Sequence, residues 1–328
     1  MVDQGLTNKI LRYIRCTAGD ETFALDMDAV YSIQRSDNLQ YDPLAPAAIG
    51  WFPLRDERVP VYLLSERLGM SKNGQSAAGR VVLMSPLPGQ VAMWGLAVDQ
   101  VSQVFTTNLE ALSPLQAALC TGSDRYFSAV LRQADNLYLM LEPASLHPDR
   151  SVSVAPKHYQ HSLASQLSAN PVQHFSGVGS AQTQQKQLIV FSLPGVEESL
   201  QFGLSITQVL ERLAPLPVIG LPGAPDYILG LVNWRDRPVP LVDLPVRLGL
   251  AASAEPGSPR LMIVRDASRK QDQIFGFLVR PNIQMLRLPV DYRAVGTKFE
   301  IPKKYVKGIV EIQDQITILP DISKVVSN

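Results

Sequence analysis

The residues best suited to chemistry are the four histidines, and they stand together in one stretch of the chain. His147, His158, His161 and His174 lie at the start of, or within, a segment from 147 to 186 that is rich in Ser, Gln, Ala, Pro and Gly. The flanking regions therefore offer no histidine for general-base chemistry, for a Ser-His or Cys-His pair, or for a histidine-containing metal site. Because carboxylate and thiolate ligands are missing nearby, His158-x-x-His161 is interpreted as part of a flexible polar segment rather than a metal site.

Other signatures of catalysis are also missing from the sequence. There is no Gly-x-x-x-x-Gly-Lys-Ser/Thr loop and no Gly-x-Gly-x-x-Gly after a strand, so no phosphate cradle is predicted. Carboxylate pairs such as Asp26 with Asp28 are interpreted as turn-forming or solvated groups rather than an acid–base dyad. The 30 basic and 30 acidic residues give a formal net charge of zero, which lacks the signature of a nucleic-acid binder. We expect no enzymatic activity, no cofactor and no metal.

The elements that would position any site are duplicated. Nine of the twenty positions from 50 to 69 are identical to those from 230 to 249, and the match continues from Arg80 at the same offset of 180 and from Tyr126 at an offset of 179. A register kept over more than 100 residues indicates two copies of one domain, and about 150 residues is ample for a domain with its own core. The sequence predicts a first domain over 1–146, a flexible linker over 147–186 and a second domain over 187–328.

The sequence of each copy predicts mostly β-strands. Short apolar runs punctuated by Gly, Pro, Asn and Asp predict strands in the first copy at 10–16, 22–26, 58–64, 80–85, 93–98, 101–106, 126–131 and 136–141. The turn at 55–57 predicts a hairpin, and Gly69 predicts the C′ end of a short helix. Further short helices are expected at 142–146 and 321–325. Many short strands in so short a domain indicate an all-β barrel or sandwich class.

Features missing from the sequence indicate the compartment in which the protein works. Cys16 and Cys120 both fall in the first copy and have no counterparts in the second, so the shared fold cannot depend on a disulfide. The N-terminal residues lack a signal-peptide pattern, and no apolar run approaches the ~20 residues of a membrane span. The sequence predicts a cytoplasmic protein without membrane insertion.

Taken in order, the motifs of the second copy resemble the CheW-like coupling domain of bacterial chemotaxis. They are Phe202-Gly203-Leu204, Val209, Gly230, Asn233, Arg235, Val239-Pro240, Asp243-Leu244 and Phe275-Gly276-Phe277-Leu278-Val279. The resemblance implies two small SH3-like five-stranded barrels per domain. It also implies a tandem adaptor without catalysis, whose partners are the regulatory domain of a CheA-type histidine kinase, the cytoplasmic tip of a chemoreceptor and other CheW-like domains.

Ten residues are candidates for partner binding. They are Val209, Glu211, Asn233, Arg235 and Gly276 in the second copy, and Val30, Arg55, Gly95, Val101 and Val104 in the first. Plainer roles stay open for most of them. The arginines can brace a solvated hairpin, the valines can face a core, and the two glycines can mark a barrel corner instead of a partner groove.

The first copy departs from the pattern, since Pro53 replaces the motif Asn, Leu63 replaces the motif Asp, and Ala24 stands where Gly203 does. We therefore predict that Arg235→Glu weakens partner binding more than Arg55→Glu. The alternative function is a peptide- or regulator-binding scaffold outside chemotaxis, in which the first domain is mainly structural. An enzyme using carboxylates on a barrel surface is the least favoured class.

Overall fold

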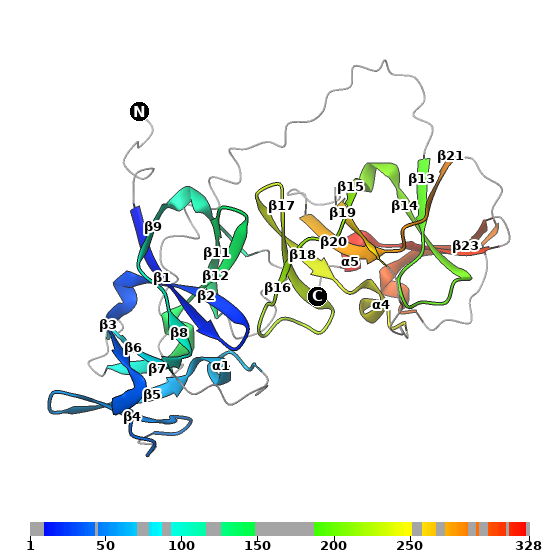
Figure 1. Cartoon of the computed structure of the whole chain (residues 1–328). Coiled ribbons are helices and arrows are strands. Elements are labelled where there is room, and N and C mark those ends of the chain that lie inside the picture. The colour runs from blue at the N-terminus through cyan, green and yellow to red at the C-terminus, as the bar shows by residue number, and fades with distance from the viewer. Residues whose placement is uncertain are drawn as a thin grey trace, which may run out of the picture.

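The computed structural model describes residues 10–42, 45–70, 79–86, 93–115, 126–147, 187–250, 258–266, 273–287, 293–294, 301–312 and 315–325. Apart from His147, the predicted linker lies outside these ranges. Figure 1 shows two β-domains, the first in blue to green and the second in green to red. The predicted all-β class is confirmed, since strands dominate both domains and the helices are short. Among the described residues, no helix is long and apolar enough to cross a membrane.

The first domain consists of two sheets. Its strands are β1 Ile10–Ala18, β2 Glu21–Asp26, β3 Val30–Arg35, β4 Gly50–Leu54, β5 Glu57–Leu63, β6 Arg80–Met84, β7 Trp94–Val98, β8 Gln100–Val101, β9 Phe105–Asn108, β10 Leu112–Ser113, β11 Phe127–Gln133 and β12 Asn136–Leu141. One sheet has the order β10-β11-β12-β2-β1-β8, with β9 also paired to β1, and the other has the order β3-β6-β7-β5-β4. The α-helices are α1 Leu64–Arg67 and α2 Pro143–Leu146, and the 3-10 turns are η1 Met27–Ala29, η2 Ser36–Asn38 and η3 Leu109–Ala111.

The second domain repeats this plan. Its strands are β13 Gln187–Phe191, β14 Leu200–Ser205, β15 Val209–Leu213, β16 Val218–Ile219, β17 Ile228–Trp234, β18 Arg237–Val242, β19 Arg260–Asp266, β20 Gln273–Val279, β21 Ile283–Arg287, β22 Arg293–Ala294, β23 Val306–Ile312 and β24 Gln315–Pro320. The sheet orders are β21-β13-β14-β24-β23-β22 and β15-β19-β20-β18-β17-β16. The helices are α4 Leu244–Arg247 and α5 Ile322–Val325, and the 3-10 turns are η5 Ile206–Gln208 and η6 Lys303–Tyr305.

The apolar residues of each strand alternate between two cores, as the period of two in a strand requires. Along β1, Leu11 and Tyr13 pack inside their own barrel, whereas Ile14 and Cys16 face the core between the barrels. Each sheet therefore has a small interior of its own and contributes its other face to a shared core. Burial in that core raises the pKa of the Cys16 thiol to about 12.

One predicted strand differs from the structure. The run 101–106 is split into β8 and β9, and residues 102–104 leave the ladder. The cause is Ser102, whose hydroxyl accepts a hydrogen bond from the backbone N–H of Arg15 at 2.9 Å. A serine side chain that takes the place of a backbone acceptor interrupts the strand pairing.

The motif that ends both repeats, Arg-Leu-Gly, anchors the last helix of each domain. Arg67 Nε donates to Leu146 O at 2.9 Å, and Arg247 Nε donates to Val325 O at 2.7 Å. The following glycine has a positive φ in both domains, 66° at Gly69 and 69° at the second copy's counterpart, so the predicted C′ role is confirmed. The same arginine therefore ties the middle of each domain to its C-terminal end.

The packed part of the first domain reaches one residue into the predicted linker. His147 is buried, and its ring meets the edge of Trp94 at a centroid distance of 5.2 Å. Arg67 Nη2 also donates to the backbone oxygen of His147 at 3.0 Å. This histidine is thus a core residue that caps the shared interior.

Candidate partner-binding surface

The arginine turn of the second domain is held by a tight hairpin between β17 and β18. Trp234 pairs with Arg237, so Arg235 and Asp236 alone form the loop. Their φ values are 48° and 61°, the left-handed conformation at both central positions that two-residue hairpins of type I′ require. The predicted hairpin is confirmed in the first domain as well, where Leu54 pairs with Glu57 and Arg55 has φ 54°.

Glu211 organises the side chains around this turn. Its Oε2 accepts a hydrogen bond from the indole Nε1 of Trp234 at 2.9 Å and another from Arg235 Nε at 3.1 Å, and Arg235 Nη2 lies 3.0 Å from the same oxygen. The strands β15 and β17, which carry Glu211 and Trp234, lie far apart in the order of their sheet. The carboxylate therefore links distant strands of the barrel and fixes the arginine, whose side chain nevertheless stays 65% exposed.

The first domain lacks this arrangement. At the positions equivalent by strand register, Ser32 replaces Glu211 and Leu54 replaces Trp234. In the described part of the chain, Arg55 makes no ion pair. Arg58 instead lies over the Trp51 ring, 4.7 Å from its centroid. The two arginine turns thus lie on equivalent hairpins, but only the second has a left-handed residue after the arginine, and their side chains are held differently.

Asn233 faces the other domain. Its Nδ2 donates to the backbone oxygen of Asp135, at the tip of the β11–β12 hairpin, over 3.4 Å. Three residues further along the hairpin, the backbone oxygen of Asp236 accepts a hydrogen bond from Arg132 Nη1. Arg132 Nε also lies 3.9 Å from the Asp236 carboxylate. The β11–β12 hairpin of the first domain lies beside β17 in Figure 1.

The domains also meet along the segment before β17. A methyl group added at Gly220 would lie 2.5 Å from a carboxylate oxygen of Glu21, and one added at Gly223 would lie 3.4 Å from the ring of Tyr126. The largest hydrophobic cluster contains buried residues of both domains, such as Tyr126 and Tyr227. The two domains therefore pack together through unlike surfaces, a C-terminal hairpin from the first and a motif hairpin from the second.

Two matches to known proteins cover most of this architecture. The model of the CheW-like domain matches residues 12–150 and 187–328, which are the two β-domains just described. The chain belongs to the CheW-like domain family. This result confirms the resemblance drawn from the motifs, including its extent over both copies.

Two similar proteins and one similar solved structure are named CheW. The chain is 29% identical over 115 residues to the chemotaxis protein CheW of Helicobacter pylori, which is 34% of this chain and 66% of that protein. It is 30% identical over 145 residues to the chemotaxis protein CheW of Thermotoga maritima, covering 43% of this chain and 89% of that protein. A crystal structure of the scaffolding protein TtCheW from Thermoanaerobacter tengcongensis matches with a TM-score of 0.36 and 23% identity, covering 44% of this chain and 89% of that one.

The candidate valines of the CheW-like domains divide into two groups. Val30, Val209 and Val101 are half-buried and pack against the shared core. Val104 is 50% exposed, in the segment between β8 and β9. Core packing accounts for the first three, and among these four valines only Val104 exposes half of its apolar side chain, so its partner contact stays a prediction.

The two candidate glycines point into barrel interiors. A methyl group at Gly95 would lie 3.2 Å from Leu83, and one at Gly276 would lie 2.9 Å from Leu261. Close packing inside the barrel therefore explains why glycine occupies both positions. A direct partner contact at either glycine stays a prediction.

Two motif residues of the second copy have structural roles, and only Asp243 differs from its counterpart in the first copy. Asp243 caps α4, because its Oδ1 accepts from the backbone N–H of Val246 at 3.1 Å, whereas the equivalent Leu63 makes no side-chain cap before α1. Gly230 leaves room for the neighbouring strand, since a methyl group there would lie 2.2 Å from Ile219 O. The divergence at Leu63 therefore changes a helix cap and says little about partner binding.

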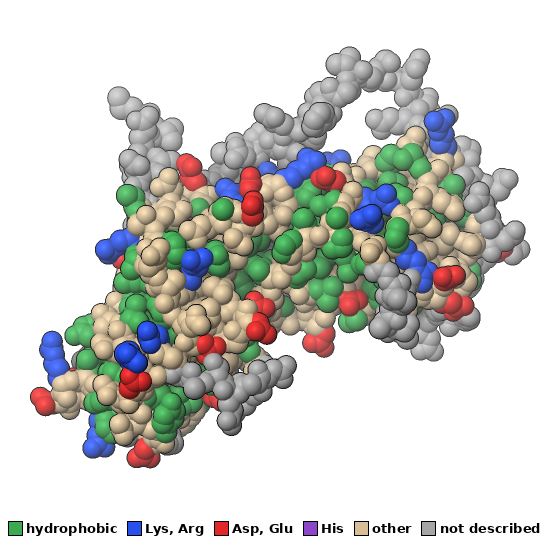
Figure 2. Space-filling view, in the orientation of Figure 1, with side chains coloured by type: hydrophobic (Ala, Val, Ile, Leu, Met, Phe, Trp, Pro, Cys, Tyr) green, Lys and Arg blue, Asp and Glu red, His purple; other side chains and the backbone are tan. Residues whose placement is uncertain are grey.

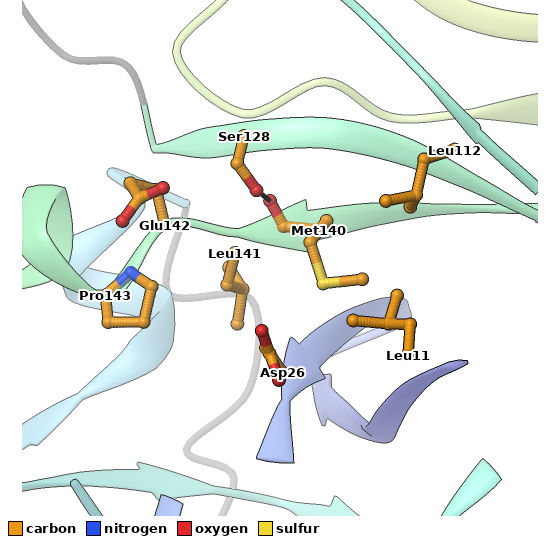
Figure 3. Close-up of a pocket in the computed structure, with 8 residues that line it drawn as sticks. All are labelled: Leu11, Asp26, Leu112, Ser128, Met140, Leu141, Glu142 and Pro143. Atoms are coloured by element: carbon orange, nitrogen blue, oxygen red, sulfur yellow. Dashed lines mark hydrogen bonds between the residues drawn. The ribbon is translucent and has the colours of Figure 1, made fainter. Parts of the chain in front are cut away.

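The carboxylate Asp26 lies at a small cavity in the first domain, drawn in Figure 3 with Leu11, Leu112, Ser128, Met140, Leu141, Glu142 and Pro143. Asp26 accepts a hydrogen bond from the backbone N–H of Asp28 at 2.9 Å and so caps η1. The cavity volume is about 10 Å³, room for roughly one water molecule. The space is too small for a substrate. Among the described residues, no group of three or more His, Cys, Asp or Glu side chains is placed to hold a metal.

Proposed function

We propose that this chain is a non-catalytic adaptor that couples chemoreceptors to a CheA-type histidine kinase in a chemotaxis-like signalling array. Membership of the CheW-like family and the names of the chemotaxis relatives support the setting. The observation that carries the proposal is the arginine turn of the second domain, where a fixed guanidinium stays largely exposed on a rigid hairpin.

Such a turn is well suited to protein recognition. Arginine is enriched at interface hot spots because its planar, always-charged fork makes several directed hydrogen bonds. Holding it on Glu211 before binding lowers the entropy that a partner contact must offset. A carboxylate of the kinase regulatory domain or of the receptor tip is the group we expect to meet Arg235.

The first domain offers a second surface on the equivalent hairpin. Arg55 and its neighbours Pro53 and Arg58 are exposed on the β4–β5 hairpin, and Trp51 is half-buried beside them. An apolar ring flanked by cations is a suitable anchor for an acidic partner segment. Two such surfaces on one chain raise the effective concentration of the second contact once the first has formed.

Charge across the molecule is consistent with protein partners. Figure 2 shows acidic and basic side chains interspersed over the face drawn, and the formal net charge of the whole sequence is zero. Nucleic-acid binding depends on concentrated positive charge that releases counterions from phosphates. We propose other proteins as the partners and exclude nucleic acid from the proposal.

The test is a titration of the full chain with the regulatory domain of a CheA-type kinase and, separately, with a soluble receptor fragment that contains the cytoplasmic tip. Arg235→Glu and Arg55→Glu are compared with Arg12→Glu, an exposed arginine of β1 that pairs with Asp28. We expect each turn variant to weaken binding at least fivefold and the control to bind as the parent does. Unchanged binding in both turn variants, with normal circular dichroism spectra, would reject the arginine surface.

A second candidate has one observation in its favour. The first domain packs its own hairpin on the second domain, as expected if it mainly supports that domain in a scaffold outside chemotaxis. The same titration separates the two functions. The scaffold function requires that neither the kinase domain nor the receptor tip binds, while other proteins bind through the second domain.

A further inference from the structure

The contact between the two domains joins unlike parts of two similar folds. The first domain supplies Arg132 and the Asp135 carbonyl from the β11–β12 hairpin, and the second supplies Asn233 and Asp236 from the β17–β18 hairpin. A contact between unlike surfaces involves one copy of each, so the equivalent β4–β5 hairpin and the β23–β24 hairpin take no part in this contact among the described residues. The chain therefore has a filled docking surface whose occupant is visible.

We propose that the Asn233 side of the β17–β18 hairpin is a docking surface for the C-terminal β-hairpin of a CheW-like domain, that the first domain fills it in cis through Arg132, and that an external domain of this kind must displace the first domain to bind there. The external partner's identity rests on the proposed function, whereas the cis contact does not.

The charge pattern favours one order of pairing. The strand registers make Glu311 of β23 the counterpart of Arg132, and Asp56 of the first turn the counterpart of Asp236. If the second domain docked its hairpin on the first turn of another molecule, Glu311 would face Asp56. Like charges at that point oppose the contact, whereas Arg132 with Asp236 favours it.

Asn233 also favours docking of the first domain on the second. Asn233 donates its amide hydrogen to the opposing hairpin, but the equivalent Pro53 has no side-chain donor and no backbone N–H. The first turn consequently cannot make the bond that the second turn makes. Arg132 and Asn233 together direct the first domain onto the second and oppose head-to-tail assembly of whole chains.

The polar bonds of this contact are weak, although apolar residues of both domains also pack together. The Asn233–Asp135 hydrogen bond is long at 3.4 Å, and the Asp236 side chain remains 77% exposed beside Arg132. A domain held by a long flexible linker competes at an effective concentration below the roughly millimolar value of a short linker. Weakening the cis contact raises the fraction of molecules in which the docking surface is uncovered. An external hairpin is expected to bind more tightly by the same factor.

The first measurement is hydrogen exchange in the full chain. Arg132→Glu places a second carboxylate beside Asp236 and is expected to speed exchange at the amides of residues 228–242 at least threefold. Arg12→Glu, a charge reversal on another strand of the same sheet, is expected to leave these amides unchanged. Equal exchange in Arg132→Glu and the parent would overturn the cis contact.

The second measurement asks whether the surface accepts a hairpin from another molecule. The Arg132→Glu variant keeps the second-domain surface intact, and the Asp236→Arg variant keeps the Arg132 hairpin intact. An arginine is expected to fit at position 236, because Arg55 and Arg235 already adopt the left-handed backbone that this position requires. In sedimentation velocity at about 100 μM, each variant alone is expected to be a monomer and the equimolar mixture to form a heterodimer. A mixture that stays monomeric would overturn the docking surface. Neither measurement uses the kinase or the receptor, so a failure of the proposed function leaves both decisive.

Discussion

Removing the Glu211 carboxylate is the sharpest perturbation of the second domain's arginine turn. One oxygen of Glu211 accepts hydrogen bonds from Trp234 Nε1 and Arg235 Nε and lies 3.0 Å from Arg235 Nη2. Glu211→Ala deletes all three contacts and leaves an indole N–H in a residue only 8% exposed without its charged acceptor. The variant tests stability and the orientation of Arg235 together.

The magnitude follows from the exposure of the two donors. A hydrogen bond from a buried donor to a charged group contributes about 1.5–3 kcal/mol, so the Trp234 bond accounts for most of the loss. The Arg235 side chain is 65% exposed, and an exposed ion pair contributes about 0–1 kcal/mol. We expect Glu211→Ala to lower the free energy of unfolding of the second domain by about 2 kcal/mol, and Glu211→Gln, which keeps an acceptor, by about 1 kcal/mol or less.

The assay is urea denaturation followed by circular dichroism, because Trp234 is the only tryptophan of the second domain and one variant removes it. The curves are fitted with a separate transition for each domain because two-domain unfolding need not be two-state. Ser32→Ala, at the equivalent position of the first domain, is the matched control and is expected within about 0.5 kcal/mol of the parent. Combining Glu211→Ala with Trp234→Phe should give a total smaller than the sum of the single changes, because both remove one interaction. Strictly additive losses, or equal losses for Glu211→Ala and Glu211→Gln, would refute the role of the Trp234 bond.

Three further predictions concern the framework. Arg247→Leu removes the hydrogen bond to Val325 O and the stacking on Tyr227, so it should destabilise the second domain by about 2–3 kcal/mol in the same denaturation assay, against little change for the exposed Arg237→Leu; equal effects would contradict the anchoring role. Gly230→Ala brings a methyl group against Ile219 O and should cost about 3 kcal/mol, and a loss under 1 kcal/mol would count against that close approach. Cys16 should resist iodoacetamide at pH 8 until urea unfolds the domain, as measured by mass spectrometry of its peptide. Burial raises its pKa, so the stability linked to this thiol is present below about pH 9 and is lost as the pH rises towards 12. A native thiol that reacts at the unfolded rate would refute its burial.

The features that depend on residues close together in the sequence could be predicted. The repeat, the two-residue turn at Arg55 and Arg235, and the glycine after each Arg-Leu pair depend on neighbouring residues only, and the structure confirms them. The family pattern also located Glu211 and Asn233 as candidates. Their locations came from resemblance, however, while their contacts came from tertiary structure.

The features that escaped prediction depend on residues distant in sequence. Glu211 meets Trp234 only because the barrel brings β15 and β17 together, and Ser102 interrupts a strand only because it bonds to Arg15. Arg132 has no motif around it, and its significance appears only when the second domain lies against it. A comparison of Arg132 with its repeat counterpart Glu311 was the one signal in the sequence that could have indicated a difference between the two C-terminal hairpins.

The two arginine turns have complementary strengths as binding surfaces. Arg235 is fixed by Glu211, so little side-chain entropy is lost when a partner arrives, but the Asn233 side of its hairpin is covered by the first domain. The Arg55 turn lies outside the contacts that join the domains, yet a partner must order its side chain at a cost of about 0.5–1.5 kcal/mol. A partner is therefore expected to reach the first domain without rearrangement and the second with better-prepared contacts once the domains separate. Because the Arg235 turn is partly covered and the Arg55 turn is not, we expect a partner to bind the first domain before the second.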